Sequence, residues 1–371
     1  MSQPIPALRK TPLDAWHRAN CGRMAGFAGW DMPAEYTGAG AEHLAVRTRA
    51  GLFDISHLGQ VEVAGRDALA AVQRVTCNDA SRLKAGQTQR SALTTPSGTF
   101  VDQIAVHRLG GSHFLLLVDP AGVGRDVAWI VDRAKSFADV AVLDTSPRYA
   151  GASLQGPMAE DVLQGLTSLV LGDLEPGWFT YGEVAGVRVT VSRTGCTGEN
   201  GYELLAPPQA APKLWTAILQ EGQPEGVVAA GLGALDTLRL EAGVRLYGTD
   251  IDEATTVLEA GLDELVDWDK GEFVGRDALV AQKTAGLTRR LVGFEMAEPA
   301  VARRGCEVFV DGVSAGTVTS GTEAPFLKKA IGLARLPAAR TAPGTLFEVD
   351  VEGRRARARV VTLPFYRRPE R

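Results

Sequence analysis

Hydrophobic and polar residues follow two different periods between residues 60 and 148, and these periods predict a unit of mixed helices and strands. The run QVEVAG at 60–65 alternates apolar and polar positions, as a half-buried strand does, whereas RDALAAVQRV at 66–75 has the spacing of an amphipathic helix. The unit continues with further segments of the same two kinds: strand-like runs near 88–95, 100–109 and 112–119, a helical run at 122–136 and a strand-like run at 139–146. Helices mixed with antiparallel hairpins predict an α+β domain rather than a doubly wound parallel sheet.

The remaining pattern predicts two more units. Residues 150–250 repeat the same mixture of strands, turns and helices, whereas residues 289–371 are almost entirely strand-like. Two dipeptides in this last part, Asp311-Gly312 and Glu352-Gly353, have the composition of tight hairpin turns. We therefore predict three lobes, the last of them a separate small barrel or sandwich.

Composition and charge indicate a globular protein and argue against a nucleic-acid partner. Of the 371 residues 45% are hydrophobic and 22% are charged, which is typical of a globular protein with a sizeable core, and the net charge is −5. The one short basic run, 352–360, alternates with apolar residues, so we interpret it as the solvated face of a strand. We therefore expect no nucleic-acid partner.

Cysteines and terminal residues indicate the compartment. The four cysteines lie far apart without a CxxC pair, so we expect neither a disulfide framework nor a zinc site, and the reducing cytoplasm fits best. Residues 1–20 lack an apolar signal core and no run approaches transmembrane length, so we expect no membrane association. The acidic stretch 247–253 lacks the spacing of a calcium loop, and no metal is predicted.

A carboxylate lies inside an apolar strand in the segment PSGTFVDQIAV, residues 96–106. Burying the Asp102 carboxylate costs free energy unless another group pairs with it or uses it. Adjacent strand residues point to opposite faces, so Asp102 and Gln103 cannot both face one pocket.

A second carboxylate follows a glycine-rich turn in SRTGCTGENGYELL, residues 192–205. Gly195, Gly198 and Gly201 allow the backbone to turn tightly and to approach a ligand closely. Glu203 then opens an apolar strand, where a flat heterocycle with adjacent N–H groups could donate two parallel hydrogen bonds to its carboxylate. The alternative is a partly exposed glutamate at the edge of a strand.

Several long stretches resemble, in order and spacing, the aminomethyltransferase of the glycine cleavage system, the T-protein family. The resemblance runs from Thr11 to the C-terminal PFYRR, and it is carried by TPLDAWHRANCGRMAGFAGWDMPAEY, EHLAVRTRAGLFDISHLGQVEV, RTGCTGENGYEL, GLGALDTLRLEAGVRLYGTDIDEATTVLEAGL and WDKGEFVGRDAL. It implies a three-lobed α+β cloverleaf with tetrahydrofolate, or its 5,10-methylene form, in a central channel. The lobes would be residues 1–59 with 149–262 (central, folate-binding), 60–148 (carrying Asp102 and Gln103) and 289–371 (a β-barrel), with 263–288 as a connecting segment.

The departures from the family pattern lie in the chemistry. Where the family has two consecutive aspartates, the second of them near the reacting folate nitrogen, this chain has Asp102 and Gln103, so we expect the amide to face the cavity. An amide cannot donate and accept protons as a carboxyl group does. Other positions that differ from the family pattern are Leu58, Arg90, Asp119, Cys196, Leu235 and Glu264.

The resemblance also implies retained positions. Glu203, which in the family holds the pterin ring, is kept, and so are Asp54, His57, Arg239, Glu241 and Tyr247. We predict a reaction site of Arg90, Asp102, Gln103 and Asp119, and folate-binding positions at Leu58, Cys196, Glu203, Leu235 and Tyr247. For some of these, simpler interpretations stay open: Cys196 as a small pocket filler rather than a nucleophile, Arg90 and Asp119 as an ion pair across adjacent strands, and Asp102 as a structural acid.

Three functional hypotheses follow. The first is a tetrahydrofolate-dependent transferase of a methyl, hydroxymethyl or aminomethyl group that acts on a small molecule at a rewritten reaction site. The second is the ordinary glycine-cleavage aminomethyltransferase, whose partner is a lipoyl carrier protein. The third is a folate-binding protein without catalytic activity. The altered reaction site favours the first hypothesis over a lipoyl carrier partner.

Overall fold

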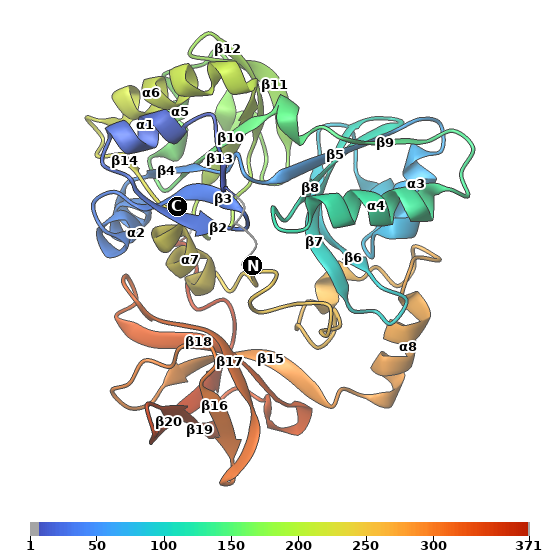
Figure 1. Cartoon of the computed structure of the whole chain (residues 1–371), viewed down its shortest axis with the longest axis vertical. Coiled ribbons are helices and arrows are strands. Elements are labelled where there is room, and N and C mark those ends of the chain that lie inside the picture. Colours follow the sequence, from blue (N-terminus) through green and yellow to red (C-terminus); the bar gives the residue numbers. More distant parts are fainter. Residues whose placement is uncertain (1–6, 370–371) are drawn as a thin grey trace, which may run out of the picture.

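The chain folds into three lobes, which Figure 1 shows in blue to yellow, in cyan and in orange to red. This computed structural model describes residues 7–369; the first six residues of the predicted central lobe and the last two of the predicted barrel lie outside the described residues. Helices and mostly antiparallel sheets are mixed in the first two lobes, and the third is a closed barrel. The predicted three-lobed α+β class is therefore confirmed.

The first lobe contains a six-stranded sheet in the order β11-β12-β13-β10-β4-β14 and a small sheet in the order β1-β3-β2. Its strands are β1 (Arg9–Lys10), β2 (Arg23–Phe27), β3 (Trp30–Glu35), β4 (Gly51–Asp54), β10 (Ala150–Gln155), β11 (Phe179–Val184), β12 (Val187–Ser192), β13 (Gly201–Ala206) and β14 (Val228–Ala229). Its helices are α1 (Asp14–Ala19), α2 (Ala39–Thr48), α5 (Ala159–Gln164), α6 (Ala211–Gly222) and α7 (Leu232–Glu241). Strand β4 joins the sheet through β10, so segments about 100 residues apart in the chain form one lobe.

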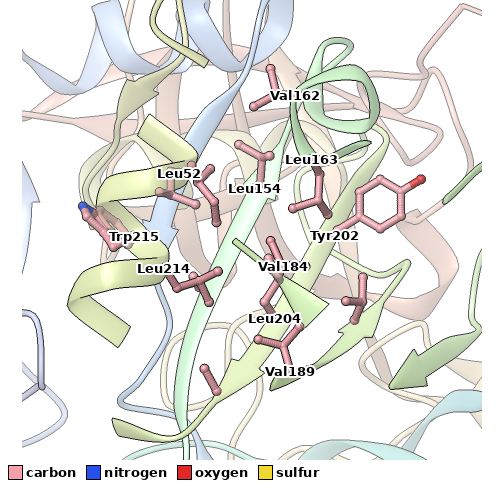
Figure 2. Packing of buried hydrophobic residues seen from close by; sticks show 14 of the residues in the cluster. Leu52, Leu154, Val162, Leu163, Val184, Val189, Tyr202, Leu204, Leu214 and Trp215 are labelled. Carbon is pink, nitrogen blue, oxygen red and sulfur yellow. The ribbon is translucent and has the colours of Figure 1, made fainter. Parts of the chain in front are cut away.

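Figure 2 shows the core of this lobe, where apolar side chains of the large sheet meet those of α5 and α6. Trp215 on α6 and Tyr202 on β13 are fully buried in it. Each Leu or Val side chain buried in this way contributes about 1.5–3 kcal/mol to stability. This core makes β13 a rigid support for the side chains that it carries on its other face.

The second lobe is a five-stranded antiparallel sheet in the order β6-β7-β8-β5-β9, covered by two helices. Its elements are β5 (Gly59–Ala64), α3 (Ala68–Val75), β6 (Thr88–Thr94), β7 (Phe100–Gly110), β8 (His113–Val118), α4 (Val123–Ala134) and β9 (Ala141–Asp144). Each matches a segment predicted from the periodicity, with ends that shift by a few residues. The alternation of apolar positions predicts this lobe well because one face of the sheet is buried under α3 and α4 (Figure 1).

The third lobe is a closed barrel in the strand order β15-β18-β17-β16-β19-β20. Its strands are β15 (Arg289–Met296), β16 (Glu307–Val310), β17 (Val313–Ala324), β18 (Lys329–Pro337), β19 (Leu346–Val351) and β20 (Arg354–Val361). Both predicted hairpin turns are confirmed, since all four of their central residues have positive φ angles between 53° and 81°. The arginines of β20 are exposed and alternate with buried alanines, so the basic run is a solvated strand face as predicted.

The segment between the first lobe and the barrel packs on the second lobe. Ile251, Val257 and Leu279, the last on α8 (Arg276–Ala285), share an apolar cluster with Cys77 and Phe100. The predicted boundaries at 262 and 288 stay a prediction. None of the helices in residues 7–369 is long and apolar enough to cross a membrane.

Candidate active site

Residues from all three lobes line one cavity of about 1150 Å³. Glu203 and Cys196 come from the first lobe, Arg90, Gln103 and Asp119 from the second, and Ser320 from the barrel. A cavity of this size is large enough for a folate-sized ligand together with a second small molecule.

One wall of the cavity presents the Glu203 carboxylate, which projects from β13. The Thr194 hydroxyl donates to Glu203 Oε2 at 2.5 Å, whereas Oε1 accepts no hydrogen bond from any residue between 7 and 369. Burial raises the pKa of Glu203, and the bond from Thr194 opposes this rise. The free oxygen can accept a hydrogen bond from a ligand in the cavity.

The glycine-rich turn approaches a side chain of the protein closely, and not only the cavity as predicted. A Cβ atom on Gly195 would lie 2.1 Å from the Gln155 side chain, and one on Gly201 would lie 2.5 Å from it. The Gln155 amide donates to the Thr194 carbonyl at 3.0 Å and accepts from the Thr197 hydroxyl at 3.1 Å. The turn is therefore folded around Gln155, which holds Thr194 where its hydroxyl reaches Glu203.

Asp102 and Gln103 point to opposite faces of the sheet, as predicted. Gln103 lines the cavity, and its buried Oε1 lacks a hydrogen-bond partner among the described residues. Asp102 is fully buried and does not line the cavity. A bulge in the ladder of β6 and β7, between Leu93 and Thr94, leaves these faces unchanged.

Asp102 has the contacts of a structural acid. Its two carboxylate oxygens accept from the backbone N–H groups of Gln103 and Asp119, each at 2.8 Å. Burial and the nearby charge of Asp126 raise the pKa of Asp102, and burial also raises the pKa of Asp126 to about 6. Asp102 thus fixes the end of β8 against β7, and of the simpler interpretations left open this one has support.

Asp119 follows β8 directly and lines the cavity. Ala105 pairs with Leu117, so the same antiparallel register places Asp119 across from Gln103. Asp119 Oδ1 accepts from the backbone N–H of Ala121 at 2.9 Å, and no ion pair to Asp119 is formed within residues 7–369. Burial raises the pKa of Asp119.

The interpretation of Arg90 and Asp119 as an ion pair across adjacent strands is wrong. Arg90 lies on β6 and Asp119 at the end of β8, and β7 separates the two strands in the sheet. Neighbouring strands are about 4.8 Å apart, so the two backbones are roughly 10 Å apart. Both side chains instead face the cavity.

The remaining predicted positions also line the cavity. Leu58 and Leu235 pack against an apolar cluster around Phe53, and the Tyr247 hydroxyl accepts from Arg125 of the second lobe at 2.9 Å. Cys196 lines the cavity as well, and burial raises the pKa of its thiol to about 12. The thiol is therefore protonated at neutral pH, which favours the pocket-filler interpretation over a nucleophile.

We expect a Cys196→Ser variant to keep at least about half of the transferase activity that the family resemblance implies, and iodoacetamide to inactivate the wild-type protein slowly at pH 7.5, because little thiolate is present. Activity and the rate of Cys196 alkylation, measured by mass spectrometry, test this. Cys21, which is exposed, serves as the internal control for alkylation. Loss of more than nine-tenths of the activity in Cys196→Ser would show a chemical role for the thiol.

One hydrogen-bond network beside the cavity was not predicted from the sequence. Asp250 accepts hydrogen bonds from Arg239 at 2.5 Å, from Ser320 at 2.6 Å and from Thr319 at 2.7 Å. This buried carboxylate joins the first lobe to the barrel wall. Its partners lie up to 70 residues away in the chain, so no local pattern could have indicated them. Within residues 7–369 no group of three or more His, Cys, Asp or Glu is placed to hold a metal ion.

Comparison with known proteins extends over the whole chain. A family model of the GCVT N-terminal domain matches residues 13–270, and one of the glycine cleavage T-protein C-terminal barrel domain matches residues 289–367. The chain is 43% identical to an aminomethyltransferase of Koribacter versatilis, with 100% of both chains covered. It is 44% identical to an aminomethyltransferase of Moorella thermoacetica, with 98% of this chain and 99% of the relative covered.

A solved structure agrees with these matches. The glycine cleavage system aminomethyltransferase T of Bartonella henselae is 31% identical, covers 97% of this chain and 98% of its own, and superposes with a TM-score of 0.91. These matches, with the two mixed lobes and the closed barrel, define a folate-dependent one-carbon transferase. The chain belongs to the glycine cleavage T-protein family. It is an enzyme, and tetrahydrofolate is its cosubstrate.

Proposed function

We propose that the chain is an aminomethyltransferase of the glycine cleavage type, which transfers a one-carbon unit from an aminomethyl-loaded lipoyl carrier protein to tetrahydrofolate and releases ammonia. The observation that carries the proposal is the match to curated aminomethyltransferases along the entire chain. The hypothesis of a small-molecule substrate at a rewritten reaction site therefore has less support than the glycine-cleavage alternative. The four cysteines are free, which fits work in the cytoplasm.

The wall of the cavity that presents the Glu203 carboxylate fits a pterin ring. Its carboxylate has one oxygen held by Thr194 and one oxygen open to the cavity, and a carboxylate binds adjacent N–H donors well. Leu58 and Leu235 supply apolar surface of the kind that a flat ring contacts. We therefore assign the pterin-anchoring role to Glu203, and tetrahydrofolate would supply the nitrogen atoms that accept the one-carbon unit.

The Asp119 carboxyl group is the proton-handling group that we assign to the reaction. It faces the cavity beside Gln103, and its raised pKa lets it hold a proton closer to neutral pH than an ordinary aspartate does. Gln103 can orient a polar ligand with its free amide oxygen but cannot exchange a proton. Asp102 would act through its backbone bonds as the positioning residue for both.

The test is an assay of ammonia and methylenetetrahydrofolate formation from an aminomethyl-loaded lipoyl carrier protein. We expect ammonia release that requires both tetrahydrofolate and the protein, with the Moorella thermoacetica aminomethyltransferase as positive control. No release above the uncatalysed rate, under conditions in which the control turns over, would contradict the proposal.

A small-molecule donor is the second candidate function, and one observation favours it. The cavity wall beside Gln103 contains the unpaired guanidinium of Arg90, which would repel the cationic aminomethyl group of a loaded carrier. The same assay with small amines that also have a carboxylate, which Arg90 can bind, in place of the carrier distinguishes the two donors.

A further inference from the structure

A staggered row of three polar side chains crosses the sheet of the second lobe, and each has a polar atom that makes no hydrogen bond with residues 7–369. They are the Arg90 guanidinium on β6, the Gln103 amide oxygen on β7 and the Asp119 carboxylate at the end of β8. Gln103 and Asp119 lie opposite each other, whereas Arg90 is displaced along the strands by two residues, because it pairs with Ala105. All three residues line the cavity. The row places a cation, a neutral acceptor and an anion in that order along one wall.

Arg90 differs from most other arginines of the cavity. Its guanidinium makes no hydrogen bond or ion pair with any residue that the structure describes, and only its backbone carbonyl accepts a bond, from Asn78. The neighbouring cavity arginines are held by the protein: Arg239 by Asp236 and Asp250, Arg193 by Glu160, Arg245 by three backbone carbonyls, and Arg303 and Arg304 by one each. Arg368, in the exposed C-terminal tail, is the other lining arginine that makes no hydrogen bond or ion pair with residues 7–369.

The surroundings of Arg90 leave its charge available. The side chain is exposed, and the charge of Glu264 acts on it without a hydrogen bond. Directly opposite on β7 lies Ala105, whose small side chain leaves room in front of the guanidinium. A guanidinium in such a place pairs best with a carboxylate, to which it can donate two parallel hydrogen bonds.

Asp119 can pair with a positively charged ligand group, because its Oδ2 accepts no hydrogen bond from residues 7–369. Its Oδ1 accepts one backbone N–H, and Arg125, whose charge acts on Asp119, donates its hydrogen bonds to Asp126, Glu253, Tyr247 and the Val101 carbonyl. The backbones of β6 and β8 are roughly 10 Å apart, and Arg90 is also displaced from Asp119 by two residues along the strands. This separation keeps Arg90 and Asp119 from forming an ion pair with each other. It leaves space between them for a molecule that has both charges.

We propose that this row binds a small α-amino acid, with its carboxylate on Arg90 and its ammonium group on Asp119 and the Gln103 amide oxygen. The proposed site lies in the same cavity as Glu203 and would bind a second ligand, a small α-amino acid. It therefore goes beyond the aminomethyl transfer proposed above. This proposal rests on the proposed function only because that function places the folate at Glu203. A carboxylate could also come from the glutamyl tail of the folate, and the experiment separates that source.

Binding of glycine to the whole protein saturated with 5-formyltetrahydrofolate tests the site, measured by the chemical shift of 13C-labelled glycine. We expect saturable binding that Arg90→Gln and Asp119→Asn each weaken about 10- to 100-fold, while Arg90→Lys retains part of it. Acetate binding should depend on Arg90 and not on Asp119, and methylamine binding the reverse. Arg74→Gln, an exposed arginine of the same lobe, is the matched control and should bind glycine as the wild type does.

The affinity for 5-formyltetrahydrofolate is measured on the same variants, and their melting temperatures verify folding. Unchanged folate affinity in Arg90→Gln together with weaker glycine binding supports the amino-acid site. Weaker folate binding in Arg90→Gln with unchanged glycine binding would place the folate tail on Arg90 and overturn the proposal. Absence of saturable glycine binding to the folate-loaded wild type would also overturn it, without bearing on the aminomethyl assay.

Discussion

An Asp119→Asn variant should transfer the aminomethyl group about 10²- to 10⁴-fold more slowly than the wild type, because a positioned general acid or base contributes about this factor. The substitution keeps the shape of the side chain and its bond to the Ala121 N–H. It removes only the ability to exchange a proton. Single-turnover rates with saturating tetrahydrofolate and loaded carrier protein measure the effect.

The pH profile separates this chemical role from a structural one. Burial raises the folded-state pKa of Asp119, so the group is protonated at low pH and loses its proton as the pH rises through the raised value. If it acts as an acid, the wild-type rate falls with rising pH over that window, and the Asp119→Asn profile lacks this fall. Gln103→Asn is the matched control, since it shortens a neighbouring amide without removing an acid. A wild-type rate in Asp119→Asn would show that another group handles the proton.

A Glu203→Ala variant should bind tetrahydrofolate about 10- to 100-fold more weakly, since a charge-assisted hydrogen bond contributes about 1.5–3 kcal/mol. Glu203 lines the cavity, and one of its carboxylate oxygens accepts no hydrogen bond from residues 7–369. Calorimetric titration of the wild type and the variant measures the change.

Two further variants make this prediction sharper. Glu183→Ala removes an exposed carboxylate from β11 of the same sheet and should leave folate affinity unchanged. Thr194→Val removes the hydroxyl that orients Glu203 and should weaken binding by less than Glu203→Ala does. Equal affinities of wild type and Glu203→Ala would rule out the pterin-anchoring role.

Local periodicity predicted most of the second lobe. It also predicted that Asp102 and Gln103 on β7 point to opposite faces of the sheet. Side chains alternate strictly along a strand, so only one of Asp102 and Gln103 could face the cavity, and the resemblance to the family indicated Gln103, which does line it. The two hairpin turns of the barrel could also be predicted from adjacent residues alone, because two successive positive φ angles select residues such as Asp-Gly.

Contacts between distant segments could not be predicted in this way. The proposed Arg90–Asp119 pair failed because the position of β7 between their strands is a property of the sheet and not of either segment. The close approach of Gly195 to Gln155 joins residues 40 apart, and Asp250 meets Ser320 across 70 residues. The resemblance to a family supplied the cavity and its ligand, which periodicity alone leaves open.

A crystal structure of the protein with bound tetrahydrofolate tests the central claim most directly. The account predicts the pterin ring against the Glu203 carboxylate, with the reacting end of the folate towards Asp119 and Gln103. A pterin bound away from Glu203, or a folate whose reacting nitrogen lies out of reach of Asp119, would contradict it.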